Sequence, residues 1–213
     1  MDDIVKAAMA KWPNVPHCYG WLALDARGQW RMRDERCQAL NLPGDVIRHQ
    51  TLIDFINRNY QCDDKGCWYF QNGPQRVYVD LDATPYIIRT IVRVKDTQQT
   101  LNNDETTLGL QLHTGQFMPT VTAASMDADG NIVLSTGKLL ALVDGRDLAQ
   151  VASHLQIDGQ HATDDALLHW LETSGSNNTL TLNLYESTTR HIHVQFSTIH
   201  TLMTVSGNIA TPR

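Results

Sequence analysis

Hydrophobic and polar positions alternate with a period of two over much of this chain, which predicts a protein rich in strands. The turn Asp25-Ala26-Arg27-Gly28 stands between two such runs and predicts a hairpin, with Gly28 suited to a positive φ. Further strands are predicted at 67–71, 75–81, 86–94, 108–112 and 120–126, with a second hairpin formed by 179–185 and 190–196. Residues 36–42 are predicted to be a short extended piece or a loop.

Apolar residues recur at helical spacing in three segments. The first runs from Asp2, which can cap it, to Lys11. The second is a central helix from Gly44 or Asp45 to 57–60, and the third spans Asp164–Leu171 behind the cap Thr163. Helices combined with antiparallel strands predict an α+β fold, in which helices pack on the sheets. The tail from Gly207 is expected to fray.

Residues 95–107 are polar and have no apolar period, so the best domain boundary lies there. We therefore predict an N-terminal α+β lobe at 1–95 and a C-terminal α+β lobe at 120–213. Residues 96–119 form a linker or a bridging strand region between them.

The segment Met126–Leu155 echoes the segment Leu24–Ile56. Both contain an Asp-Ala-x-Gly turn at a corresponding distance from an apolar helix. One interpretation is an internal duplication of a hairpin–helix unit, so that the two lobes are related. The other is coincidence, because a hairpin followed by a helix is a frequent supersecondary unit.

Composition excludes several classes of function. The formal net charge is −6 and 42% of the residues are hydrophobic, as in a soluble globular protein without the basic face that nucleic acid requires. The N-terminus opens with two acidic residues and does not resemble a secretory signal. No apolar stretch reaches the length of a membrane span. We expect a cytoplasmic protein, without nucleic-acid or membrane partners, whose four cysteines are free thiols.

The stretch KWPNVPHCYGWLALDARGQWRMRDERCQALNLPGDVIRHQTLIDFINRNY, followed by GCWYFQNGPQRVYVDLDATPY, resembles an uncharacterised proteobacterial family of roughly 200-residue proteins. The resemblance is strongest over residues 11–90. The same elements are more distantly similar to another bacterial family of unknown function. The resemblance implies an α+β fold with two related lobes, and it brings no catalytic residues.

Three groups of residues could carry chemistry, and for each we prefer a plain structural interpretation. Cys62 and Cys67 flank a turn at the wide limit of zinc spacing, without a second pair. His191 and His193 share one face of a strand, without a third ligand. The remaining group is His161, Asp165 and His169, spaced by four, where Asp165 could orient His169 as in an acid–base pair. Nucleophile and phosphate-loop motifs are absent. No metal, cofactor or catalytic residue is therefore predicted.

Arginine, tyrosine and asparagine together are the composition of a recognition surface. The candidate binding residues are Arg48, His49, Arg58, Tyr60, Arg76 and Tyr78. Strand alternation places Arg76 and Tyr78 on the face opposite Val77 and Val79, where a charged fork beside an aromatic plane suits an anion or a planar group. We expect this face to be exposed, and the alternative is an ordinary solvated surface.

The sequence favours a non-catalytic cytoplasmic binding or regulatory module for a small ligand or a protein partner. One alternative is an enzyme with a site between the lobes that uses histidine and aspartate residues. The other is a homodimeric interaction or scaffold protein that associates through an exposed strand.

Overall fold

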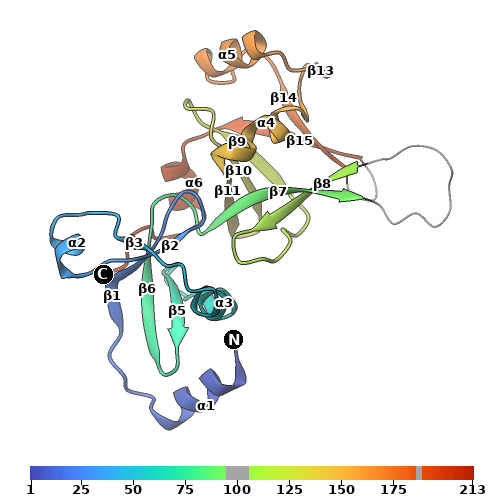
Figure 1. The fold of residues 1–213 in the computed structure, drawn as a ribbon. Coiled ribbons are helices and arrows are strands. Elements are labelled where there is room, and N and C mark those ends of the chain that lie inside the picture. The colour runs from blue at the N-terminus through green and yellow to red at the C-terminus, as the bar shows by residue number, and fades with distance from the viewer. Residues whose placement is uncertain (95–105, 186–188) are drawn as a thin grey trace. The chain divides into compact units, whose positions relative to one another are not determined.

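The computed structural model describes residues 1–94, 106–185 and 189–213 and shows an α+β fold with two mixed sheets (Figure 1). The α+β class predicted from the sequence is thereby confirmed. The chain forms two compact units. The first comprises Met1–Ile87, His113–Gly115 and Ile199–Arg213, and the second comprises Ile88–Leu112 and Gln116–Thr198.

The first unit is built on a sheet of six strands. In sheet order these are β3 (Asp45–Val46), β2 (Trp30–Met32), β1 (Cys18–Leu24), β6 (Gln75–Leu81), β5 (Trp68–Asn72) and β4 (Tyr60–Cys62). All neighbours are antiparallel except β1 and β6, which run parallel. The helices of this unit are α1 (Asp3–Lys11), α2 (Glu35–Ala39), α3 (Gln50–Arg58) and α6 (Ile199–Val205).

The second sheet has nine strands. In sheet order these are β13 (Gln160–His161), β12 (Leu155–Ile157), β14 (Leu180–Tyr185), β15 (Thr189–Phe196), β9 (Ala123–Met126), β10 (Ile132–Thr136), β11 (Leu139–Val143), β7 (Tyr86–Val94) and β8 (Thr106–Leu112). The helical elements of the second unit are η1 (Gly145–Asp147), α4 (Leu148–Ala152) and α5 (Asp164–Glu172). Leu134, Leu155 and Leu182 are fully buried in this unit.

The two sheets share a strand order. The series β3-β2-β1-β6-β5-β4 of the first sheet corresponds to β11-β10-β9-β15-β14-β12 of the second. In the first sheet, β1 is antiparallel to its hairpin partner β2 on one side and parallel to the later strand β6 on the other. In the second sheet, β9 is antiparallel to β10 and parallel to the later strand β15. The shared strand order therefore covers more of the chain than the hairpin–helix unit that suggested a duplication in the sequence. An internal duplication remains a prediction.

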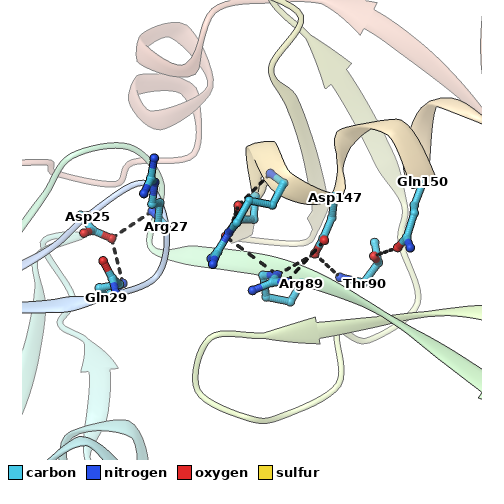
Figure 2. Close-up of polar contacts among 9 residues, drawn as sticks. Asp25, Arg27, Gln29, Arg89, Thr90, Asp147 and Gln150 are labelled. Atoms are coloured by element: carbon cyan, nitrogen blue, oxygen red, sulfur yellow. Dashed lines mark hydrogen bonds and ion pairs between the residues drawn. The ribbon is translucent and has the colours of Figure 1, made fainter. Parts of the chain in front are cut away.

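The Asp-Ala-x-Gly turns have the same internal hydrogen bonds. In the first, shown in Figure 2, Asp25 Oδ1 accepts from the amides of Arg27 and Gln29 at 3.0 and 2.8 Å. In the second, Asp127 Oδ1 accepts from the amides two and four residues later at 3.0 and 2.9 Å. The aspartate fixes each turn because its short side chain reaches its own backbone.

Two segments of the first unit differ from the predictions. Residues 36–42 were predicted to be extended or a loop, but 36–39 belong to the helix α2. Its N-cap Asp34 accepts a hydrogen bond from the amide of Cys37 at 2.8 Å. The central helix was predicted to begin at Gly44 or Asp45, but Asp45–Val46 form strand β3 and the helix begins at Gln50. Pairing of β3 with β2 therefore overrides the helical period of the apolar residues there.

The C-terminal tail is held by hydrogen bonds, so the expectation that it frays was wrong. Asn208 Oδ1 accepts from Trp68 Nε1 at 2.7 Å, and the carbonyl of Ala210 accepts from the amide of Leu81 at 2.8 Å. Residues 199–213, which the predicted boundaries place in the C-terminal lobe, pack in the first unit. Of the predicted linker, 96–105 lie outside the described residues and 106–112 form β8.

In the second unit, β7 is tied to the segment that precedes α4. Asp147 Oδ2 accepts from Arg89 Nε at 2.7 Å and from the amide of Thr90 at 2.8 Å (Figure 2). Asp147 is 7% exposed, and both bonds offset the cost of burying its carboxylate. We therefore assign Asp147 and Arg89 a structural role.

The described helices include none with the length and apolar character needed to cross a bilayer. This result agrees with the absence of long apolar runs in the sequence.

An aromatic cluster surrounds His113 in the first unit. The ring of His113 lies 5.3 Å from Trp30, 5.9 Å from Tyr60 and 5.7 Å from Tyr86, measured between centroids. Its Nδ1 accepts a 3.3 Å hydrogen bond from the amide of Ile87, so the neutral ring carries its proton on Nε2. This Nε2 is buried without a partner among the described residues. Burial lowers the pKa of His113 to about 3, and nearby Asp25 opposes the shift.

We expect acid to destabilise the protein through His113. Above the ordinary histidine pKa of about 6.5 the ring is neutral in both states. Below it, the unfolded chain binds a proton that the folded chain excludes, so the free energy of unfolding falls until the pH reaches the folded pKa of about 3. At about pH 5 the loss is at most about 2 kcal/mol relative to about pH 7.5.

Urea unfolding of the wild type and of His113→Gln at the two pH values measures this loss. The glutamine variant lacks the titrating ring and should lose less stability on acidification. His193→Gln, which removes an exposed histidine, is the control and should behave as the wild type. If the free energy of unfolding depended equally on pH in all three proteins, His113 would not be the source of the acid sensitivity.

Candidate functional site

The structure brings together two of the six candidate residues. Arg76 and Tyr78 share one face of β6, with the Arg76 guanidinium 4.6 Å from the ring of Tyr69 on β5. Tyr78 is only 6% exposed, so the expectation that it lies on an open surface was wrong. Its hydroxyl donates to Asp63 Oδ2 at 3.0 Å, and burial raises the pKa of Tyr78 while neighbouring Arg76 opposes the shift.

The other four candidates lie elsewhere or have structural roles. Tyr60 is 8% exposed, donates to the carbonyl of Pro85 at 3.0 Å, and has a pKa raised well above its usual value by burial. His49 Nδ1 accepts from the amide of Leu52 and caps α3. Arg58 lies 3.4 Å from Asp2 at the surface, and Arg48 is exposed.

Helix α3 lies on the sheet face opposite Arg76 and Tyr78. Phe55 of α3 packs on Phe70 of β5 at 5.3 Å, whereas Tyr69 of the same strand packs on Tyr78 at 5.6 Å. Successive residues of a strand point to opposite faces. The candidate residues at the two ends of α3 therefore do not join Arg76 and Tyr78 in one site.

A polar pocket lies on the Tyr78 face of the first sheet. Its volume is about 340 Å³. It is lined by Tyr19, Gly20, Arg33, Gln38, Asn41, Asp80 and Arg213. These residues come from β1, from the segment between β2 and β3, from β6 and from the C-terminal tail. The first unit alone supplies all of them.

A bulge in β1 forms one wall of the pocket. The pairing of β1 with β6 shifts so that Tyr19, Gly20 and Trp21 stand opposite Tyr78 alone. Gly20 has φ +77°, and a Cβ at this position would lie 2.8 Å from Gln38 Oε1. A bulge of this kind changes the direction of neighbouring side chains. The positive φ favours glycine at the bulge, and the missing side chain leaves room for Gln38.

Tyr19, which the bulge redirects, lines the pocket and also contacts Tyr78 on the strand face predicted from the sequence. Its ring stacks on that of Tyr78, with centroids 4.6 Å apart and planes inclined by 2°. The rings of His17 and Tyr78 form an edge-to-face pair, with centroids 5.8 Å apart. Because Tyr19 is still 37% exposed, it can offer an aromatic surface beside the polar lining.

The charged lining is centred on Asp80, which is 7% exposed. Its Oδ2 accepts from Arg33 Nη1, and its Oδ1 lies 3.4 Å from Arg213 Nη1. Arg33 is 9% exposed and also donates from Nε to the carbonyl of Leu42 at 3.1 Å and from Nη2 to Asn41 Oδ1 at 3.3 Å. The pair of Arg33 and Asp80 is therefore held in place from several sides before any ligand arrives.

The groups that the sequence suggested for chemistry do not converge. His191 and His193 are exposed on β15, and His191 Nδ1 lies 2.7 Å from Asn183 Oδ1. His161 is on β13 and not on α5, so its spacing from Asp165 does not place them on one helix face. Across 1–94, 106–185 and 189–213, no three or more His, Cys, Asp or Glu side chains are grouped to hold a metal ion.

The pocket residues Tyr19, Arg33, Gln38, Asn41 and Arg213 were missed from the sequence. Asp80 was not among the candidate binding residues, although strand alternation places it on the same face of β6 as Arg76 and Tyr78. One signal was present for β1, because an isolated glycine inside a strand pattern indicates a bulge, and Gly20 is such a glycine. No local pattern could have placed Arg213 beside Asp80, which lies 133 positions earlier.

Comparison with known proteins found two solved structures and one family model. A DUF1285 family protein from Silicibacter pomeroyi DSS-3 shares the fold, with 13% identity, a TM-score of 0.50 and coverage of 95% of this chain and 98% of that one. A DUF1285 family protein from Shewanella baltica OS155 has 13% identity and a TM-score of 0.39, and the match covers 61% of this chain and 88% of that one. No curated protein matches. The family model DUF2944, described as "Protein of unknown function (DUF2946)", spans residues 1–213, so the chain belongs to this uncharacterised family, as the resemblance in the sequence indicated.

Proposed function

We propose that this protein is a non-catalytic binding module of the cytoplasm, and that it holds a small ligand in the polar pocket of its first unit. The observation that carries the proposal is the bulge at Gly20, which opens the sheet beside a preformed Arg33–Asp80 pair. Ligand sites combine a preformed concave shape with a few fixed polar groups. The pocket has both features, and its volume of about 340 Å³ suits a small molecule.

The chemistry of the lining favours binding over catalysis. A general base needs a carboxylate or imidazole that is free to take a proton from the substrate. Asp80, the acid of the lining, has an arginine near each of its oxygens. Such a carboxylate is occupied in orienting neighbouring guanidinium groups. A protein partner and a homodimer remain the alternatives for what the molecule recognises.

Screening a library of small polar compounds, with anionic, neutral and cationic members, tests the proposal. The side-chain NH₂ signals of Gln38 and Asn41 in ¹H–¹⁵N spectra report the pocket directly. Gln38→Glu and Asn41→Asp assign these signals, because each variant lacks one of them. Gln50 and Asn178 lie outside the lining and serve as reference signals.

We expect at least one compound to shift the Gln38 and Asn41 signals with saturation, while Gln50 and Asn178 stay unchanged. A library in which every bound compound shifts signals elsewhere, or in which no compound shifts these two, would contradict a ligand site in the pocket.

A further inference from the structure

We infer that the ligand of this pocket is a small planar carboxylate, a class represented by benzoate. The inference rests on the proposed function and names the class of compound that the same site takes. Its starting point is that two guanidinium groups, of Arg33 and Arg213, line the pocket. A guanidinium group is a planar fork of N–H donors that matches the geometry of a carboxylate.

The two arginines are not equivalent. Arg33 uses Nε, Nη1 and Nη2 on Leu42, Asp80 and Asn41, so its donors are largely committed to the protein. Arg213 is bound more weakly, with its Nη1 3.4 Å from Asp80 Oδ1 and 2.9 Å from the carbonyl of Pro212. Its side chain is 68% exposed, and its Nε and Nη2 have no partner within the described residues. Arg213 is therefore the group that is free to grip a carboxylate with two donors.

The amides of the lining add donors in fixed orientations. Asn41 Oδ1 accepts from Arg33, which leaves the Asn41 NH₂ group as a donor. Gln38 Nε2 donates to the carbonyl of Arg33 at 3.1 Å, which fixes that side chain against Gly20. A carboxylate accepts hydrogen bonds and donates none, so it matches a site rich in N–H groups.

The aromatic wall and the volume narrow the class further. Tyr19 already stacks one face of its ring on Tyr78, which holds the ring in one orientation beside the pocket. A flat ring can stack in the same way on an aromatic surface of this kind. The 340 Å³ volume is at the small end for ligand pockets and holds on the order of ten non-hydrogen atoms. Benzoate meets these conditions.

Titrations with benzoate, benzamide, acetate and inorganic phosphate, followed by the Gln38 and Asn41 signals, test the inference. Benzamide keeps the ring and removes the charge, and acetate keeps the charge and removes the ring. We expect benzoate to bind on the order of ten-fold more tightly than benzamide, because a hydrogen bond to a charged group contributes this much. Acetate and phosphate should also bind more weakly than benzoate.

Arg213→Gln should weaken benzoate binding on the order of ten-fold and leave benzamide unchanged. The matched control is Arg27→Gln, which removes the same charge at an exposed position outside the lining and should bind benzoate as the wild type does. Tyr19→Leu should abolish the preference for benzoate over acetate. Equal affinity for benzoate and benzamide, or tighter binding of phosphate, would overturn the carboxylate inference while leaving a ligand site intact. Benzoate that shifts neither signal would overturn it as well.

Discussion

Replacing Arg33 by leucine is expected to lower the free energy of unfolding by about 3–5 kcal/mol, because the buried Asp80 loses its main cation. Asp80 is 7% exposed, and leucine offers no donor in place of Nη1. The change also removes the bonds to Leu42 and Asn41 that hold the segment between β2 and β3. Urea unfolding followed by tryptophan fluorescence measures the loss.

The double variant Arg33→Leu, Asp80→Leu distinguishes the cost of an unpaired buried carboxylate from the cost of lost packing. Removing both charges should recover part of the stability lost in Arg33→Leu, since no buried carboxylate then stands without its partner. Arg27→Leu, at an exposed turn position, is the control and should change stability by less than about 0.5 kcal/mol. A loss below about 1 kcal/mol in Arg33→Leu would contradict the tight Arg33–Asp80 pair.

Gly66→Ala is expected to cost about 3 kcal/mol or more, from two causes that add. Gly66 has φ +85°, a conformation that costs an L-residue about 1–2 kcal/mol. A Cβ there would also lie 1.7 Å from the carbonyl oxygen of Gly207, so the backbone must move. The same contact region includes the hydrogen bond from the amide of Ile209 to the carbonyl of Gly66 at 2.9 Å.

Gly130→Ala provides the comparison for that prediction. Gly130 also has a positive φ, +79°, but a Cβ there meets nothing within 4 Å. Thermal unfolding should therefore show only the conformational cost of about 1–2 kcal/mol in Gly130→Ala and a clearly larger loss in Gly66→Ala. Equal losses would mean that the C-terminal tail does not dock at Gly66.

Local patterns predicted the parts of the fold that depend on local chemistry. Alternation found the strands of both hairpins and is clearest in β15, where Ile192 and Val194 are buried and the histidines that alternate with them are exposed. The Asp-Ala-x-Gly turns were recognised because Asp25 and Asp127 bond to their own backbones. The start of α3 was predicted too early because histidine is not among the preferred capping residues, yet His49 caps the helix.

Long-range pairing explains what the sequence did not reveal about the candidate site. The alternation of side chains along β6 correctly placed Arg76 and Tyr78 on one face of the sheet. Alternation alone does not show which residues cover that face. Tyr19 covers Tyr78 only because the bulge at Gly20 redirects it. The joining of Arg213 to Asp80 depends on the C-terminal tail reaching β6, where the carbonyl of Ala210 accepts from the amide of Leu81.

The central claim is that the pocket beside Tyr19 binds a small anionic ligand, and a crystal structure with 4-bromobenzoate tests it most directly. Anomalous scattering from bromine locates the compound by a signal that no atom of the protein or solvent produces with the same strength. We predict one bromine peak inside the pocket, with the carboxylate within hydrogen-bond distance of the Arg213 guanidinium and the ring on Tyr19. A bromine peak at another position, or an empty pocket at a concentration that saturates the protein in solution, would contradict the claim.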